Sequence, residues 1–571
     1  MKNKREKKNV FIQGTILAAA GIITRVIGFA YRIPMTNMLG SDGNGVYSIA
    51  FEIYNIVLML SSYSMPLAVS KLVSARLALK QYNNSYRVFK DAMLFAVCVS
   101  TLGMLFLYFG AGFLADLYST PELVRPLRVL APTLFVVGML GVVRGYFQGT
   151  STMIPTAISQ IFEQIFNAVF SIGAVWFCMS KLAKGAGSYK TDAITSAQGA
   201  YEGIRLSYRV QQASFGAAGG TFGTLTGALI ALLFLLFTFM IYKPTIMKRN
   251  RRDEFGITQS HGEVYRQLIF TVIPVVISQT VYQIGYVIDD LIFSKAMVTK
   301  GMSNSVRKSL QGVFNSQYTV LINVPIAVAT AMAASSIPSI VTSYTRGNVK
   351  EANKKTGAII KFVMVVAFPS AVGLAVLSSP IIRTLFRSPS LRAYNLTGAR
   401  LLTYGSIAIV FYSLSTITSA ILQGLDHMNV PVRNSGISLI IHLILMVALL
   451  YKTDLNVYAL LIGDITFPLL ISILNWLSVK KYIGYRQEIG KTFGVPLISS
   501  ALMGVAAWIV YYLLFMLTKS MYIGLLFSVA VAVVVYAVLI LAFRCFEVDE
   551  LYELPMGGRL VTLGRKLGFY N

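Results

Sequence analysis

The chain has 571 residues, of which 55% are hydrophobic and only 13% are charged, whereas soluble domains carry about 25% charged residues. The apolar residues gather in charge-free runs such as 92–115, 210–242 and 520–543, and about 20 apolar residues are enough for a helix to cross a bilayer. This composition excludes a soluble enzyme, a disordered chain and a disulfide scaffold, and it disfavours a barrel of short alternating strands.

The chain is strongly basic, because its 50 Lys and Arg residues outnumber its 23 Asp and Glu residues and give a formal net charge of +27. In a soluble protein this excess would suggest nucleic-acid binding. In a membrane protein, basic loops hold the cytoplasmic side, so we expect no nucleic-acid partner. The three cysteines form neither a disulfide framework nor a metal-binding pattern. The basic N-terminus leads into a long span without a cleavage pattern, which predicts a retained first helix.

We predict an all-α, multi-pass protein of the cell membrane with fourteen transmembrane helices. The predicted spans are 11–33, 46–70, 91–115, 125–147, 156–180, 215–242, 266–294, 312–342, 357–382, 398–422, 434–451, 456–479, 492–518 and 520–543. An even number of spans places both termini on one side. The excess of Lys and Arg in predicted inner loops, such as 243–252 and 350–361, favours cytoplasmic N- and C-termini.

Short sequence matches indicate an internal repeat. Gly45-Val-Tyr47 matches Gly312-Val-Phe314, and Gln148-Gly149 matches Gln423-Gly424. Helices 1–6 and 7–12 therefore read as two copies of one unit, inserted in the same orientation, with the substrate site between them. The predicted parts are an N-lobe at 1–245, a C-lobe at 246–485, helices 13 and 14 at 486–545 and a cytoplasmic tail at 546–571.

The first span carries two arginines, although charged residues inside a membrane are costly and usually face a cavity or a partner. Arg25 and Arg32 are seven positions apart and share one helix face with Gly21 and Gly28. Two guanidinium groups on one face suit a phosphate or pyrophosphate bound in a forked geometry. The alternatives are that Arg32 reaches up to the lipid headgroups and that the glycines only allow close helix packing.

Acidic residues near the predicted outer side suggest partners for these arginines. Glu52 and Asn55 lie on one face of helix 2, where Glu52 either balances an arginine in the absence of substrate or is an interfacial residue. The repeat aligns Arg32 with Asp289, and parallel repeats place equivalent positions facing each other. We therefore expect an outer gate of Arg32 with Asp289 or Asp290, against the alternative of unrelated interfacial charges.

Three further candidates inside predicted spans are Glu163, Asp464 and His442. Glu163 and Asp464 are candidates for an ion relay, and an interhelical hydrogen bond is the competing reading, favoured for His442. With three histidines the chain has little from which to build a zinc site or a catalytic triad. A GxxxxGK[ST] phosphate loop is also missing from the sequence. We expect no enzymatic activity, no metal and no cofactor, so transport would draw on an ion gradient, the membrane potential or the substrate gradient.

The stretches 24–35, 45–47 and 66–74 resemble the stage V sporulation protein B/YtgP group of the MOP exporter superfamily, which also contains the MurJ lipid II flippases and the Wzx polysaccharide flippases. The resemblance covers essentially the whole chain. It implies alternating-access movement of an undecaprenyl-pyrophosphate-linked saccharide, with lipid II the first expectation and a teichoic or capsular precursor the alternative. It also implies that Arg25 and Arg32 line a cationic cavity, and that helices 13 and 14 form a groove for the lipid tail.

A MATE-type cation or drug antiporter of the same superfamily is the main competing function. Such a protein should place a carboxylate in the cavity of the N-lobe, whereas helix 1 offers arginines. A membrane scaffold or a lipid-sugar transferase is disfavoured, because a scaffold has little need of buried arginines and the loops lack clustered acidic or histidine residues. The expected partners are the lipid-linked substrate, membrane lipids and a coupling ion, and the expected state is a monomer.

Overall fold

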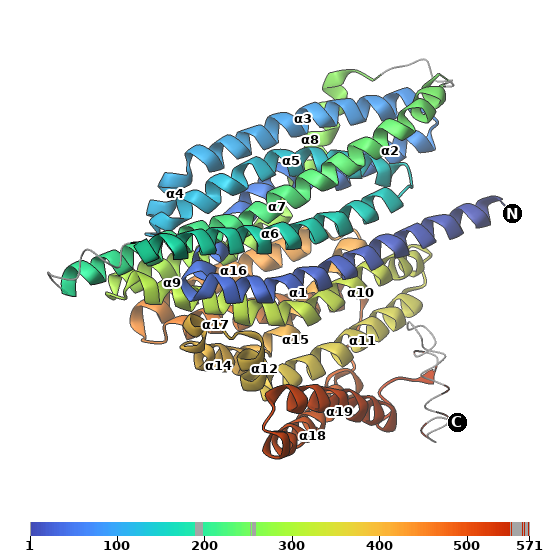
Figure 1. Ribbon diagram of the computed structural model, residues 1–571. Coiled ribbons are helices and arrows are strands. Elements are labelled where there is room, and N and C mark those ends of the chain that lie inside the picture. Colours follow the sequence, from blue (N-terminus) through green and yellow to red (C-terminus); the bar gives the residue numbers. More distant parts are fainter. Residues whose placement is uncertain are drawn as a thin grey trace. The chain divides into compact units, whose positions relative to one another are not determined.

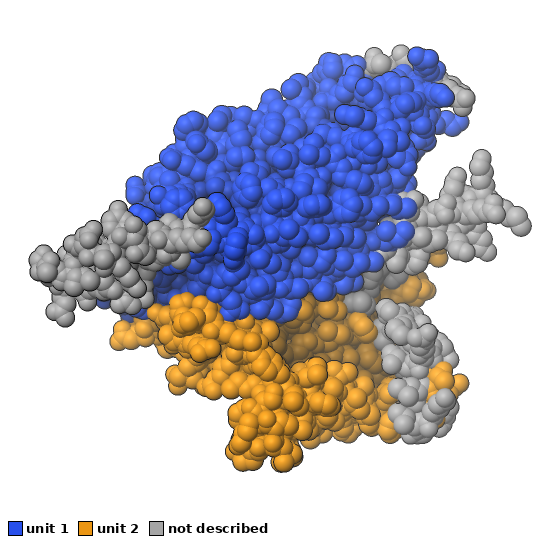
Figure 2. Space-filling view, viewed as in Figure 1, with its two compact units in different colours: residues 1–312 blue, residues 313–571 orange. Residues whose placement is uncertain are grey.

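The computed structural model describes residues 2–188, 198–251, 253 and 259–548, together with 550, 562, 565 and 569. These residues form helices and connecting turns, and no strand occurs among them. The chain divides into two compact units, Met1–Gly312 and Val313–Asn571, which Figure 2 distinguishes by colour. The all-helical prediction is confirmed.

Unit 1 is built mainly of long apolar helices, drawn in blue to green in Figure 1. Its elements are α1 (Lys2–Leu58), η1 (Met59–Tyr63), α2 (Met65–Ala78), α3 (Tyr82–Phe109), α4 (Ala111–Leu117), η2 (Pro121–Leu123), α5 (Val124–Gly149), α6 (Ile154–Ser188), α7 (Gln198–Asn250), α8 (His261–Thr299) and α9 (Asn304–Val313).

A kink at Gly40 divides α1 into two predicted spans. Gly40 has φ 70° and ψ −171°, a conformation that glycine adopts at no steric cost because it lacks Cβ. The side-chain amide of Asn44 donates to the carbonyls of Thr36 (2.8 Å) and Gly40 (2.5 Å). Asn44 thereby satisfies backbone acceptors that the kink removes from the helical ladder, and it fixes the direction in which the second half of α1 continues.

Glycines allow close approach of backbones in two places in unit 1. A Cβ on Gly145 of α5 would lie 2.7 Å from the carbonyl oxygen of Pro66 on α2. A Cβ on Gly312 of α9 would lie 2.7 Å from the backbone nitrogen of Gly45 on α1, and one on Gly45 would collide with the carbonyl of Lys308. Gly45 and Gly312, which the predicted repeat makes equivalent, therefore contact each other.

Unit 2 is drawn in yellow-green to red in Figure 1. Its elements are η3 (Phe314–Tyr318), α10 (Thr319–Thr345), α11 (Val349–Val376), α12 (Ser378–Leu385), α13 (Pro389–Arg392), α14 (Asn395–Gly405), α15 (Ala408–Gly424), α16 (Asn429–Lys452), α17 (Val457–Ile483), η4 (Gly490–Gly494), α18 (Val495–Thr518) and α19 (Met521–Ala542).

The last helices of unit 2 pack on α11. Met503 and Ala507 of α18 and Ala532 of α19 form a buried cluster with Leu377 at the end of α11. After α19, Cys545 and Phe546 are buried in a second apolar cluster, which continues onto α11. The beginning of the predicted tail is therefore part of the folded unit.

Ten helices of the described part are long and apolar enough to cross a membrane, or eleven if the bent pair α14 and α15 forms one span. One of the ten, Ala19–Ala78, covers two predicted spans. The predicted spans 266–294 and 312–342 coincide with α8 and with η3 and α10. All fourteen predicted spans thus lie on helices, while a count of fourteen membrane crossings stays a prediction.

The compact units do not divide where the repeat was predicted to divide. The boundary between the predicted lobes falls between residues 245 and 246 of the sequence, whereas the boundary between the units falls between Gly312 and Val313. The difference arises because α8 packs on α1, α2 and α3. The two six-helix copies stay a prediction about sequence ancestry and membrane orientation.

Candidate functional site

The glycine and arginine face of α1 lies against α6. A Cβ on Gly28 would sit 3.7 Å from the side-chain oxygen of Gln164 on α6, and a Cβ on Gly21 would meet no atom of the described residues within 4 Å. The side chain of Arg25 is exposed and that of Arg32 is half-buried. The predicted face therefore combines open space beside Gly21 with polar groups of a neighbouring helix.

Arg32 is held by an aromatic ring. Its guanidinium carbon lies 5.7 Å from the centre of the Tyr47 ring, an arrangement in which the ring face attracts the cation. The Nε atom of Arg32 is buried and has no hydrogen-bond partner among the described residues. A buried donor without a partner is costly, so Arg32 keeps a capacity to bind an acceptor at this point.

A polar network fixes the position of Tyr47. The Tyr31 hydroxyl is hydrogen-bonded to Tyr47 and accepts a bond from the side-chain amide of Asn167 on α6 (3.2 Å). The Ser171 hydroxyl lies 3.0 Å from the Asn167 side-chain oxygen and 2.8 Å from the Gly220 carbonyl on α7. Three helices thus hold the ring on which Arg32 rests, and such linked bonds restrict a site to one geometry.

The structure brings the predicted acidic residues together around Glu52. The Glu52 carboxyl group is hydrogen-bonded to Asp290 and interacts electrostatically with Asp289 and Arg32. One Glu52 oxygen is buried without a hydrogen-bond partner in the described part. Asn55, one turn further along α1, is half-buried. One arginine and three carboxyl groups therefore meet where α1 and α8 pack together.

The two candidates for an ion relay are each engaged by other side chains. Glu163 pairs with Arg144 of α5 at 2.7 Å. In unit 2, the hydroxyls of Tyr318 and Tyr412 both lie 2.7 Å from oxygens of Asp464. Both carboxyl groups connect helices in this conformation. Their use in ion coupling stays a prediction.

His442 packs among apolar groups of unit 2. Its ring centre lies 5.4 Å from that of Phe467, and a Cβ on Gly463 would lie 2.7 Å from its Cε1 atom. Gly463 therefore makes room for the imidazole on α17.

A second charged cluster in unit 1 was not predicted. Lys308 of α9 pairs with Glu122 of η2 at 2.5 Å, with side chains 3% and 1% exposed. Arg307 is fully buried and donates to the carbonyls of Tyr118 (3.1 Å) and Ser119 (2.8 Å). The sequence showed these residues only as loop charges, and nothing in it links positions almost two hundred residues apart.

No group of three or more potential metal ligands is found in the part of the chain that the structure describes. Cys98 is exposed, Cys178 is half-buried and Cys545 is buried, and all three are free thiols.

Comparison with known sequences identifies similar proteins. Residues 11–217 match the family described as polysaccharide biosynthesis protein. Lipid II flippase MurJ of Bacillus subtilis (strain 168) is 27% identical over 516 residues, which cover 88% of this chain and 89% of that protein. Stage V sporulation protein B of the same organism is 22% identical over 559 residues, which cover 97% and 99%. The chain is a homologue of these two proteins.

Solved structures of membrane transport proteins have a similar fold. The inward closed conformation of lipid II flippase MurJ aligns with a TM-score of 0.63 at 14% identity, covering 93% of this chain and 99% of that one. An inward-facing multidrug resistance MATE family transporter of the MOP superfamily also gives 0.63 at 14% identity, covering 82% and 98%. The chain is a multi-pass membrane protein with the MurJ/MATE-like fold. The similar proteins whose names state an activity are a flippase and a transporter, not enzymes.

Proposed function

We propose that this protein is a flippase that moves an undecaprenyl-pyrophosphate-linked saccharide, and specifically lipid II, across the cytoplasmic membrane by alternating access. The similarity to MurJ and to stage V sporulation protein B supports the substrate class. The observation that carries the proposal is Arg32, a guanidinium resting on Tyr47 with a buried Nε atom that lacks a partner in the described part.

The physical argument starts from the substrate. A diphosphate joined to a saccharide is too polar to cross hydrocarbon unaided. A fixed guanidinium lowers that barrier through charge-assisted, forked hydrogen bonds, while the prenyl tail stays in lipid. In this proposal Arg25 and Arg32 contact the diphosphate, and Glu52 and Asn55 border the same site. Both termini lie in the cytoplasm, and the protein acts as a monomer with a coupling ion.

A second candidate is a MATE-type cation antiporter, and one observation favours it. Glu52, which interacts with Arg32, also interacts with Asp289 and Asp290, and clustered carboxyl groups attract cations rather than a diphosphate. A flippase for a teichoic or capsular precursor shares the diphosphate chemistry of lipid II, so only a test of the saccharide separates those two substrates.

The test is flipping of fluorescent lipid II in proteoliposomes, with a teichoic precursor and a cationic dye offered in parallel. We expect lipid II movement to fall at least tenfold in Arg32→Ala and in part in Arg32→Lys, because lysine keeps the charge but loses the fork. The control is Arg125→Ala, since Arg125 also rests on a ring (Phe215, 4.1 Å) but lies outside the site. Full activity of Arg32→Ala would remove Arg32 from the site, and transport of the dye alone would favour the antiporter.

The proposed outer gate has its own test. Arg32→Asp and Asp289→Arg should each abolish flipping, because each change leaves like charges facing one another near Glu52. If the two residues act as a pair, the double exchange should recover part of the flipping lost in the single variants, because it restores the ion pair although Arg32 is still missing from the diphosphate site. Continued inactivity of the double variant, with normal insertion of all three proteins, would contradict the gate.

A further inference from the structure

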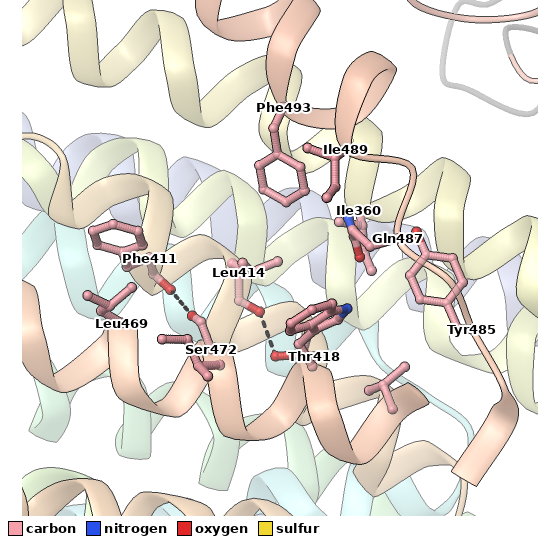
Figure 3. Close-up of a pocket in the computed structure, with 13 residues that line it drawn as sticks. Ile360, Phe411, Leu414, Thr418, Leu469, Ser472, Tyr485, Gln487, Ile489 and Phe493 are labelled. Carbon is pink, nitrogen blue, oxygen red and sulfur yellow. Dashed lines mark hydrogen bonds between the residues drawn. The ribbon is translucent and has the colours of Figure 1, made fainter. Parts of the chain in front are cut away.

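Unit 2 contains an apolar cavity of about 210 Å³ between α11, α15, α17 and the segment that leads into α18. Figure 3 shows its wall, to which Phe411 and Leu414 of α15, Leu469 of α17 and Phe493 of η4 contribute. Trp476 of α17 also lines it and is 37% exposed. The cavity therefore reaches the surface of the unit.

The hydroxyl groups in the wall are already satisfied. Ser472 donates to the carbonyl of Phe411 (3.0 Å), and Thr418 donates to the carbonyl of Leu414 (2.7 Å), as the dashed lines in Figure 3 show. Both bonds turn the oxygens back to the backbone of α15. This part of the cavity thus offers only apolar surface, which suits a hydrocarbon chain.

Two polar atoms at one end of the cavity are not satisfied. Tyr485 and Gln487 belong to the connection between α17 and η4 and line the cavity. The Tyr485 hydroxyl and the Gln487 amide nitrogen are buried and have no hydrogen-bond partner among the described residues. Tyr485 is only 5% exposed. Burial raises the pKa of Tyr485, so its hydroxyl stays protonated and able to donate.

The connection is held in place over α11, so these donors are fixed. The side-chain amide of Asn353 donates to the carbonyl of Ile483 (3.0 Å), and Lys361 pairs with Glu488 at 3.2 Å. A Cβ on Gly357 would lie 3.4 Å from the Tyr485 hydroxyl, so the absence of a side chain there leaves room for the ring. Positioned donors favour a ligand with one defined acceptor.

The charge of the cavity indicates which acceptor fits. All residues that line it are uncharged. The nearby ammonium group of Lys361 is bound to Glu488 and to Glu550 (2.9 Å). A phosphate group attached directly to a chain would need a cation at this end. A neutral carbonyl needs only donors such as a hydroxyl and an amide.

We propose that this cavity binds one acyl chain of a glycerophospholipid, whose ester carbonyl accepts hydrogen bonds from the Tyr485 hydroxyl and the Gln487 amide. In such a lipid the carbonyl stands at the head of the hydrocarbon chain, as the two donors stand at the end of the apolar wall. The phosphate lies outside the cavity, toward the exposed Lys480 and Lys481 in the last turn of α17. Basic residues at a membrane surface attract lipid phosphates.

Quenching of Trp476 by a brominated lipid tests the proposal. Trp176→Phe and Trp508→Phe leave Trp476 as the only tryptophan of the chain. The purified full-length protein in detergent is titrated with dibromostearoyl phosphatidylglycerol, and we expect saturable quenching by one lipid per protein. A matched protein that keeps only Trp508, which is 54% exposed on α18, should show only gradual, unsaturable quenching.

Two sets of variants distinguish binding of the acyl chain from binding of its ester carbonyl. Leu414→Phe together with Leu469→Phe fills the cavity and should abolish saturable quenching. Tyr485→Phe and Gln487→Leu each remove one neutral hydrogen bond and should raise the half-saturating lipid concentration roughly 2- to 10-fold. Size-exclusion profiles and helical content show whether each variant is folded, so a loss of binding in a folded variant is informative.

An ether lipid supplies the decisive comparison, because it has the same hydrocarbon chain as the diacyl lipid but no ester carbonyl. A dialkyl phosphatidylglycerol should displace the probe more weakly than the diacyl form from the wild type, and equally well from the Tyr485→Phe/Gln487→Leu protein. Equal displacement from the wild type, stronger displacement by a polyprenyl phosphate, or the absence of a saturable site would each overturn the proposal. The assay contains no saccharide substrate, so its outcome is independent of the flippase proposal.

Discussion

The ion pair between Glu122 and Lys308 offers a test of how unit 1 is held together. Its atoms are 2.5 Å apart and its side chains are 1% and 3% exposed. At an effective dielectric constant near 20, two unit charges at that distance attract by about 7 kcal/mol. Removing each charge from water costs several kcal/mol. The two terms nearly cancel, so the pair as a whole adds little net stability.

Loss of one partner has a different effect, because it leaves the other charge buried without its ion-pair partner. We expect Glu122→Gln to lower the free energy of unfolding by about 3–5 kcal/mol, and Lys308→Met to lower it by a similar amount. The double variant should lose far less than the sum of the two. SDS-induced unfolding in mixed micelles, followed by circular dichroism, measures all three free energies.

An exposed pair serves as the control. Lys355 and Glu351 are also close, at 2.8 Å, but their side chains are 23% and 45% exposed, and water screens such pairs. Glu351→Gln should therefore leave the unfolding curve unchanged. Additive losses in the Glu122/Lys308 double variant, or a single loss no larger than that of the exposed pair, would refute the reasoning.

Three further predictions follow from single contacts. Gly45→Ala should prevent normal accumulation of the protein, because the added Cβ would collide with the backbone of α9. Gly436→Ala on α16 should be neutral, because no atom of the described residues lies within 4 Å of the added carbon. The yield of each variant in the membrane measures both effects. Tyr412→Phe should cost about 1–3 kcal/mol of unfolding free energy, because it removes one of two hydroxyl donors to Asp464. Burial raises the pKa of Cys545 to about 12. In a variant whose other two cysteines are replaced by serine, alkylation of Cys545 at pH 8 should therefore be about a thousandfold slower than that of an ordinary thiol. Fast labelling of the folded protein would contradict this.

The helices were predictable from the sequence for a simple reason. Inside a bilayer every backbone donor and acceptor must be satisfied within the protein, and a continuous helix does this over any apolar run of sufficient length. The run at 92–115, for example, lies on α3 and α4, and the run at 520–543 coincides with α19. The kink at Gly40 was not predictable in the same way, because it depends on the left-handed conformation of one residue and the Asn44 bonds that stabilise it.

The candidate site was predictable only in part. The shared helix face of Arg25 and Arg32 follows from helical periodicity, and the repeat pointed to Asp289 as a neighbour of Arg32. Glu52 was also predicted as a partner of an arginine of helix 1. Its hydrogen bond to Asp290 was not predicted, because it depends on the packing of α8 on α1, which sequence spacing does not encode. Arg144, the partner of Glu163, lies inside a predicted span, so its charge alone could have drawn attention to it.

The mixture of charges at the α1–α8 site sets a condition on transport. A diphosphate that binds Arg32 must compete with Glu52, which interacts with the same guanidinium, so binding of the diphosphate and separation of Arg32 from Glu52 would occur together. In a cation antiporter the competition is for the carboxyl groups instead, because the cation takes the place of Arg32 beside them. The two mechanisms therefore demand opposite responses to Arg32→Ala. Anion movement would be lost in the first case, whereas cation binding would become stronger in the second.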